Sequence, residues 1–159
     1  NGTFDIRVLA TYVKQLDLIG IAGSTTKLAG NMAQPLIDGV NGTPHWRGQA
    51  VLGYSTDAFR ANVTGRYVGG GVVTRDFIAS KPDVPITDPI NAKNRLYIDL
   101  SGEVGLFSVG AEGKVSLYGA IQNLFNTDPP VTGYDGYGAP RQLFDLIGRQ
   151  YNIGVRVTL

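Results

Sequence analysis

Few side chains in this sequence have the types and spacing that catalysis or metal binding requires. The single histidine, His45, stands beside Trp46, and we interpret it as an interfacial residue rather than as a ligand or a general base. No cysteine is present, so thiolate metal sites and disulfides are excluded. Four aspartates stand in turn-like stretches with Pro or Gly, where Asp caps its own backbone: Asp83, Asp88, Asp128 and Asp135. The sequence therefore predicts no catalytic, metal or cofactor site and no enzyme.

Two glycine-containing segments remain as candidates for binding. Gly69-Gly70-Gly71 could form a phosphate cradle, but no Lys-Ser/Thr pair follows it, and we interpret it as the flexible upper end of a strand. The cluster at residues 134–138 (YDGYG) has the composition of an exposed loop that touches a ligand. The candidate ligand contacts are Tyr134, Asp135, Tyr137 and Arg75.

Strands must position these residues, because apolar and polar side chains alternate with a period of two in six segments. These segments are residues 3–13, 46–55, 59–69, 95–106, 114–124 and 150–159. When the apolar positions of each strand are placed on one face, the charged residues all fall on the other face. They are Asp5, Arg7, Arg47, Arg60, Arg66, Arg95, Asp99, Glu103, Lys114 and Arg156. A half-covered soluble sheet would show the same segregation, so alternation alone does not decide the fold.

The length of the segments and the position of their aromatic residues favour a membrane. Strands of about 9–11 residues are long enough to cross a bilayer at a tilt, whereas strands of soluble proteins average about 5–6 residues. Aromatic residues stand near the ends of the apolar face, as in the pairs Phe4 with Tyr12 and Phe59 with Tyr67. Aromatic girdles flank the apolar band of outer-membrane barrels in this way. A soluble β-sandwich with an aromatic core is the alternative.

The connections between the segments alternate in length. Residues 56–58 and 108–113 form short turns, whereas residues 18–43, 75–94 and 126–149 form long loops. Transmembrane barrels combine short periplasmic turns with long extracellular loops. With a periplasmic C-terminus, all three long loops are extracellular. The sequence therefore predicts an all-β fold, an antiparallel transmembrane β-barrel in the bacterial outer membrane.

Six strands are too few for a closed barrel, because the smallest single-chain outer-membrane barrels have about 8 strands. An open sheet in lipid would leave two edges of unpaired backbone groups. We therefore expect residues 1–159 to be the C-terminal segment of a larger barrel domain, its last six strands. The net charge of +1 without a basic block argues against nucleic acid as a partner. No apolar run approaches the length of about 18 residues that a membrane-spanning helix needs.

The last third of the chain carries motifs of a known family. Residues 123–126 (NLFN), followed by 128–130 (DPP), resemble the NLF(D/N)…P motif of TonB-dependent outer-membrane receptors. Residues 144–151 (FDLIGRQY) resemble the YDxxGRxY motif that enters the final strand of that family. Residues 152–159 (NIGVRVTL) are similar to the C-terminal assembly signal of outer-membrane barrels. Phe144 stands where Tyr is usual, and Leu159 stands where Phe is usual.

The resemblance implies a fold, a function and partners. It implies a barrel of about 22 strands around a plug domain, with the plug and its TonB box absent from these residues. It implies an assembly signal read by the barrel-assembly machinery, made by Asn152, Gly154, Val157 and Leu159. The implied partners are outer-membrane lipid and lipopolysaccharide, the remaining strands and plug, TonB through the plug, and a small-molecule ligand.

The implied function is energised import of a scarce ligand: a ferric siderophore, a cobalamin or a carbohydrate. A passive porin-type channel and a β-barrel enzyme or adhesin are the alternatives. A porin would lack the plug, and an enzyme would need a nucleophile with a base among the inward residues.

Overall fold

The computed structural model describes residues 1–20, 23, 25–32, 42–72, 91–110, 113–130 and 143–158. In these ranges the chain is entirely β-structure and irregular connections, and all strand pairs of its sheets are antiparallel. The predicted all-β, antiparallel class is therefore confirmed. No helix that is long and apolar enough to cross a membrane occurs within the described ranges.

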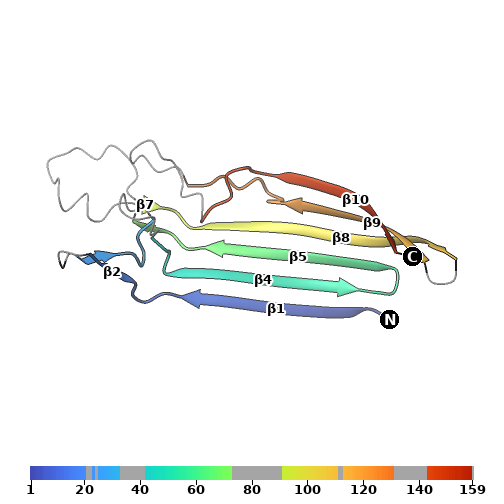
Figure 1. The fold of residues 1–159 in the computed structure, drawn as a ribbon, viewed down its shortest axis with the longest axis horizontal. Coiled ribbons are helices and arrows are strands. Elements are labelled where there is room, and N and C mark those ends of the chain that lie inside the picture. The colour runs from blue at the N-terminus through green and yellow to red at the C-terminus, as the bar shows by residue number, and fades with distance from the viewer. Residues whose placement is uncertain are drawn as a thin grey trace.

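One six-stranded sheet dominates the molecule (Figure 1). Its strands lie side by side in sequence order, so each strand pairs with the long strand that follows it along the chain. They are β1 (Thr3–Tyr12), β4 (Trp46–Ser55), β5 (Phe59–Val68), β8 (Arg95–Val109), β9 (Gly113–Gln122) and β10 (Gln150–Thr158). Figure 1 shows the β4–β5 turn and both chain termini at one end of the sheet and the short strands β2 and β7 at the other. We call these the turn end and the loop end.

Four short strands at the loop end were not predicted from the sequence. β2 (Asp17–Ile19) pairs with β3 (Thr25–Lys27), and β6 (Gly71–Val72) pairs with β7 (Asn91–Ala92). They fall in or beside the segments expected to be long loops. Each has only two or three residues, which is too short for alternation to be recognisable.

The register of the long sheet places its apolar residues on one continuous face. One row of paired residues crosses all six strands: Ile6, Leu52, Val63, Leu100, Ile121 and Tyr151. Neighbouring rows on this face, two residues away along each strand, are also uncharged. Many of these side chains are exposed, from 37% for Leu100 to 80% for Ile153. We call this the apolar face, and the opposite side the polar face.

β8 differs from its expected course. It was expected to end at residue 106 and to be followed by a turn at residues 108–113, but the strand continues to Val109 and β9 begins at Gly113. A β-bulge explains the difference, because Gly105 pairs with Ser116 and Phe107 pairs with Val115, which leaves Leu106 as the extra residue. The bulge moves Phe107, not Leu106, into register with the apolar face.

The small hydrophobic core lies at the loop end. It consists of Met32, Val68, Ala92, Tyr97 and Phe144, with Leu143 packed against it. The glycines at 69–71 permit this packing, because a Cβ atom on Gly70 or Gly71 would meet the backbone oxygen of Ala92 or Gly30. These glycines follow the end of β5, as expected, and allow backbone segments to approach closely there.

Candidate functional site

Two rows of aromatic residues bound the apolar face. The loop-end rim consists of Tyr12, Trp46, Tyr67 and Tyr151, and the turn-end rim of Phe4, Tyr54, Phe59 and Phe107. In each rim the aromatic rings of β1 and β4 are in contact: the ring centroids are 4.7 Å apart both for Phe4 with Tyr54 and for Tyr12 with Trp46. Between the rims, the apolar face of the six strands carries no charged side chain.

Both rims are inclined to the strands. Tyr12 of β1 lies six residues beyond Ile6, and Ile6 is in the same register row as Tyr151 of β10. Between β1 and β10, which are five strand spacings apart, the loop-end rim therefore shifts by six residues along the strand direction. With about 3.3 Å per residue and about 4.8 Å between strands, this stagger corresponds to an angle of about 40°. Strands of transmembrane barrels tilt by about 35–45°.

The polar face carries every charged side chain of the six long strands and pairs several of them. Toward the turn end, Arg156 Nη1 lies 2.9 Å from Glu103 Oε2. Toward the loop end, Arg66 Nε donates to Asp99 Oδ2 at 2.7 Å, and Arg66 Nη2 donates to Asp99 Oδ1 at 3.1 Å. This bidentate pair joins β5 to β8 with a fixed orientation.

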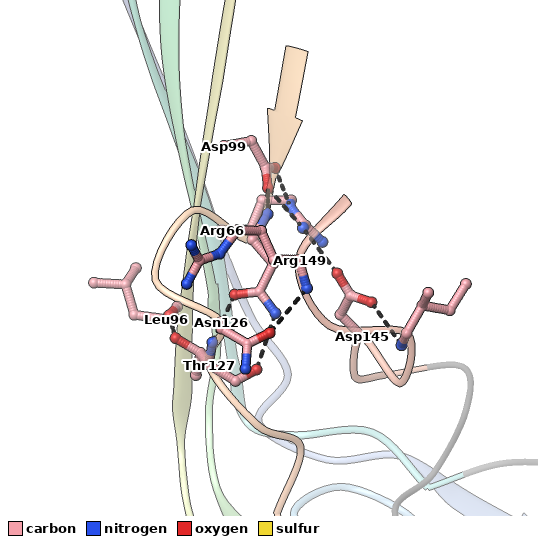
Figure 2. Close-up of polar contacts among 9 residues, drawn as sticks. Arg66, Leu96, Asp99, Asn126, Thr127, Asp145 and Arg149 are labelled. Carbon is pink, nitrogen blue, oxygen red and sulfur yellow. Dashed lines mark hydrogen bonds and ion pairs between the residues drawn. The ribbon is translucent and has the colours of Figure 1, made fainter. Parts of the chain in front are cut away.

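Asp99 also starts a network that we call the clasp, made by Asp99, Asn123, Asn126, Thr127 and Arg149. Figure 2 shows Asp99, Asn126, Thr127 and Arg149 of this network. The backbone N–H of Asn123 donates to Asp99 Oδ1 at 2.8 Å. The Asn123 side chain closes a turn, because its Oδ1 accepts from Thr127 N at 2.8 Å and its Nδ2 donates to Thr127 O at 3.0 Å. Asn126 Oδ1 accepts from the backbone N–H of Arg149 at 3.0 Å. The clasp thus ties β8, the end of β9 and the entry to β10 together.

Both asparagines of the clasp have left-handed backbone conformations, with φ of 51° for Asn123 and 52° for Asn126. Asparagine tolerates this region better than most residues other than glycine. The segment before β10 is held from the other side: Phe144 is buried in the core, and Asp145 Oδ2 lies 3.7 Å from Arg66 Nη2. The NLFN motif (residues 123–126) and the FDLIGRQY motif (residues 144–151) are therefore in direct contact.

A second arrangement involves Gly154, one of the residues expected to form the assembly signal. Gly154 pairs with Tyr118, and the Tyr118 ring occupies the space that a Cβ atom at 154 would need. The Arg156 guanidinium lies over the same ring, 5.5 Å from its centroid. Ser116 Oγ donates to Glu103 Oε1 at 2.6 Å. Gly154 therefore gives Tyr118 and Arg156 the room to join β8, β9 and β10.

This contact predicts opposite effects of alanine at two glycines. Gly154→Ala should lower the free energy of unfolding by up to about 1 kcal/mol, because Tyr118, which is 40% exposed, must move off Arg156. Gly119→Ala should be neutral or stabilising by up to about 1 kcal/mol, since the nearest atom to its Cβ would be Asn152 O at 3.5 Å. Urea unfolding of the protein folded in lipid measures both changes.

The control for this prediction is the double variant Gly154→Ala with Tyr118→Ala. Removal of the ring should abolish most of the cost of the alanine, as a coupling in a double-mutant cycle. An equal cost of Gly154→Ala with and without Tyr118 would show that the ring is not the cause.

The structure places the predicted residues as follows. Asn152 lies on the polar face opposite Ala120, and Val157 lies on the apolar face opposite Val115. Asp128 accepts a hydrogen bond from Arg95 Nε through its backbone oxygen, at 2.6 Å. The following residues lie outside the described ranges: Leu159, Tyr134, Asp135, Tyr137, Arg75, Asp83 and Asp88.

His45 is bonded to the chain segment that follows β1. Its Nδ1 donates to the backbone oxygen of Val13 at 2.7 Å, and its ring lies against Gly30. Among the described residues, no group of three or more His, Asp or Glu side chains converges in a way that could hold a metal ion.

Sequence reasoning did not identify Asp99, Asn123, Asn126 and Arg149 as an interacting group. The available signal was the pair of asparagines around Leu124 and Phe125, because Asn is enriched at positive φ. Comparison of the chain with protein-family models, with curated proteins and with solved structures finds no match.

Proposed function

We propose that the six long strands are part of a transmembrane β-barrel of the bacterial outer membrane, and that this barrel belongs to a TonB-dependent receptor. The receptor imports a scarce small molecule (a ferric siderophore, a cobalamin or a carbohydrate) in a process energised through TonB.

The observation that carries the membrane assignment is the charge-free apolar face between two inclined aromatic rims. In β1, β4 and β5 the rim residues of each strand are eight positions apart: Phe4 to Tyr12, Trp46 to Tyr54, and Phe59 to Tyr67. This distance is about 26 Å along a strand and about 20 Å in height after a tilt of about 40°. The apolar band of outer-membrane barrels is about 25 Å tall. A water-facing sheet would gain nothing from exposing this surface.

The open edges of the sheet support a larger barrel. β1 and β10 are its edge strands, and within the described part of the chain they do not pair with each other. In lipid, unpaired backbone groups on these edges would each cost several kcal/mol. Further strands are therefore needed to close the barrel.

The assignment to TonB-dependent receptors rests on the two motifs and on their contact. The family resemblance lies in two separate stretches of sequence, residues 123–130 and 144–151. In the fold, Asn126 of the first stretch bonds Arg149 of the second. Their joint function in orienting the final strand accounts for the presence of both motifs in one chain.

The proposal predicts which end of the sheet faces the outside of the cell. A cysteine that replaces Ile147, 78% exposed at the loop end, should react with a membrane-impermeant thiol reagent on intact cells. A cysteine that replaces Asp57, exposed in the β4–β5 turn, should react only after the outer membrane is permeabilised. Residues 1–159 contain no cysteine, so a label found on a peptide from this segment comes from the introduced cysteine. Mass spectrometry of the isolated protein measures the labelling.

Labelling of the Asp57 variant alone on intact cells would invert the topology, and labelling of both would contradict a membrane-spanning sheet. Uptake tests the second part of the proposal. Ligand uptake should stop when the proton-motive force is collapsed or TonB is removed. Uptake that persists under both conditions would replace the receptor by a passive channel.

A further inference from the structure

A hollow on the polar face lies at the loop end of β1, β4 and β5. Its volume is about 560 Å³, within the range of about 300–1,000 Å³ that is common for small-molecule sites. Its apolar lining comes from Leu143, Phe144 and Val68, of which Val68 is paired with Arg47 in the sheet. Its polar lining comes from Thr11, Arg47 and Gln49, and Arg66 and Asp145 also border it. A hollow that combines apolar side chains with a few polar groups is the usual form of a binding site for a small ligand.

The register explains why these polar groups converge. Thr11 of β1 is paired with Arg47 of β4, and Gln49, two residues further along β4, is paired with Leu9 of β1 and with Arg66 of β5. Side chains two residues apart on a strand point to the same face. The Thr11 hydroxyl, the Arg47 guanidinium and the Gln49 amide are therefore neighbours on one side of the sheet.

The two arginines of the hollow differ in their partners. Arg66 is occupied by two carboxylates, Asp99 at 2.7 Å and Asp145 at 3.7 Å. Arg47 forms no hydrogen bond or ion pair with any part of the chain that the structure describes. It is exposed, and its guanidinium keeps all of its donors for a partner outside these residues.

We infer that this hollow is a subsite for an oxyanion group of a small ligand, a carboxylate or a phosphate, with Arg47 as its principal donor. A guanidinium binds both groups with two parallel hydrogen bonds, and Gln49 and Thr11 add neutral donors beside it. Phe144 and Leu143 supply an apolar wall for the remainder of the ligand. The inference deepens the proposed function by narrowing the imported ligand to an anionic one.

Isothermal titration of the intact, detergent-purified protein with citrate and, separately, with inorganic pyrophosphate tests this subsite. We expect wild-type protein to bind at least one of them, and Arg47→Gln to bind it roughly tenfold more weakly. Arg47 is exposed, so its replacement leaves the packing unchanged. Lys114→Gln, which removes the same charge near the turn end of the polar face, should bind as the wild type does.

The two titrants distinguish a carboxylate subsite from a phosphate subsite. Absence of binding by wild-type protein, or equal binding by wild type and Arg47→Gln, would overturn the inference. The measurement does not depend on transport, so its result is separate from that of the uptake experiment. A protein that binds citrate through Arg47 without TonB-dependent uptake would retain the subsite and lose the proposed function.

Discussion

Val63→Arg should destabilise the protein folded in lipid by about 2–4 kcal/mol, the cost of a cation at the bilayer midplane on the outside of a barrel. Val63 lies halfway along β5 between its rim residues, Phe59 and Tyr67. It is also in the central row of the apolar face, paired with Leu52 and Leu100. An arginine at this position has the longest path to either interface. Urea titration of the protein reconstituted in lipid vesicles measures the loss.

Thr64→Arg is the matched control for this substitution. Thr64 is the next residue of the same strand, and its side chain is on the polar face with Arg66 and Asp99. The same arginine should therefore cost less than about 1 kcal/mol there, because this face is not in contact with lipid. Equal losses for Val63→Arg and Thr64→Arg would contradict the assignment of the apolar face to the membrane.

Much of the long sheet could be predicted because its information is local. In β5, alternation alone places Phe59, Val63 and Tyr67 on one face and Arg60 and Arg66 on the other. Because successive side chains of a strand point to opposite faces, no other assignment is possible. The antiparallel pairing of β4 with β5 and of β8 with β9 followed from connections too short to permit anything except neighbouring strands.

The bulge in β8 could not be predicted, because local alternation is ambiguous there. Leu106 and Phe107 are both apolar, so the pattern fits the apolar face equally well with either residue in phase. The choice is made by the partner strand, where Val115 pairs with Phe107. The clasp was also beyond a sequence argument, because Asp99, Asn123 and Arg149 are far apart in the chain and meet only through the register of three strands.

Asn123→Ala should have an effect of similar size, a loss of about 2–4 kcal/mol in the free energy of unfolding. Asn123 is fully buried, at 0% exposure. Alanine would leave the backbone N–H and C=O of Thr127 without the partners that the asparagine side chain provides. Each unsatisfied group costs about 1–3 kcal/mol. The φ of 51° adds backbone strain in the variant, because alanine has a Cβ atom and no side-chain hydrogen bonds to compensate for it.

Asn94→Ala is the control, because it removes an asparagine side chain that is not part of the clasp. Asn94 is exposed, and its Nδ2 donates to the Tyr67 hydroxyl at 3.3 Å, so its removal should change stability by less than about 0.5 kcal/mol. Hydrogen exchange gives a second, local measurement: the amide of Thr127 should lose protection in Asn123→Ala but not in Asn94→Ala. If both variants kept wild-type stability and Thr127 stayed protected, the clasp would not hold β9 to the entry of β10. The contact between Asn126 and Arg149 would then have to orient the final strand alone.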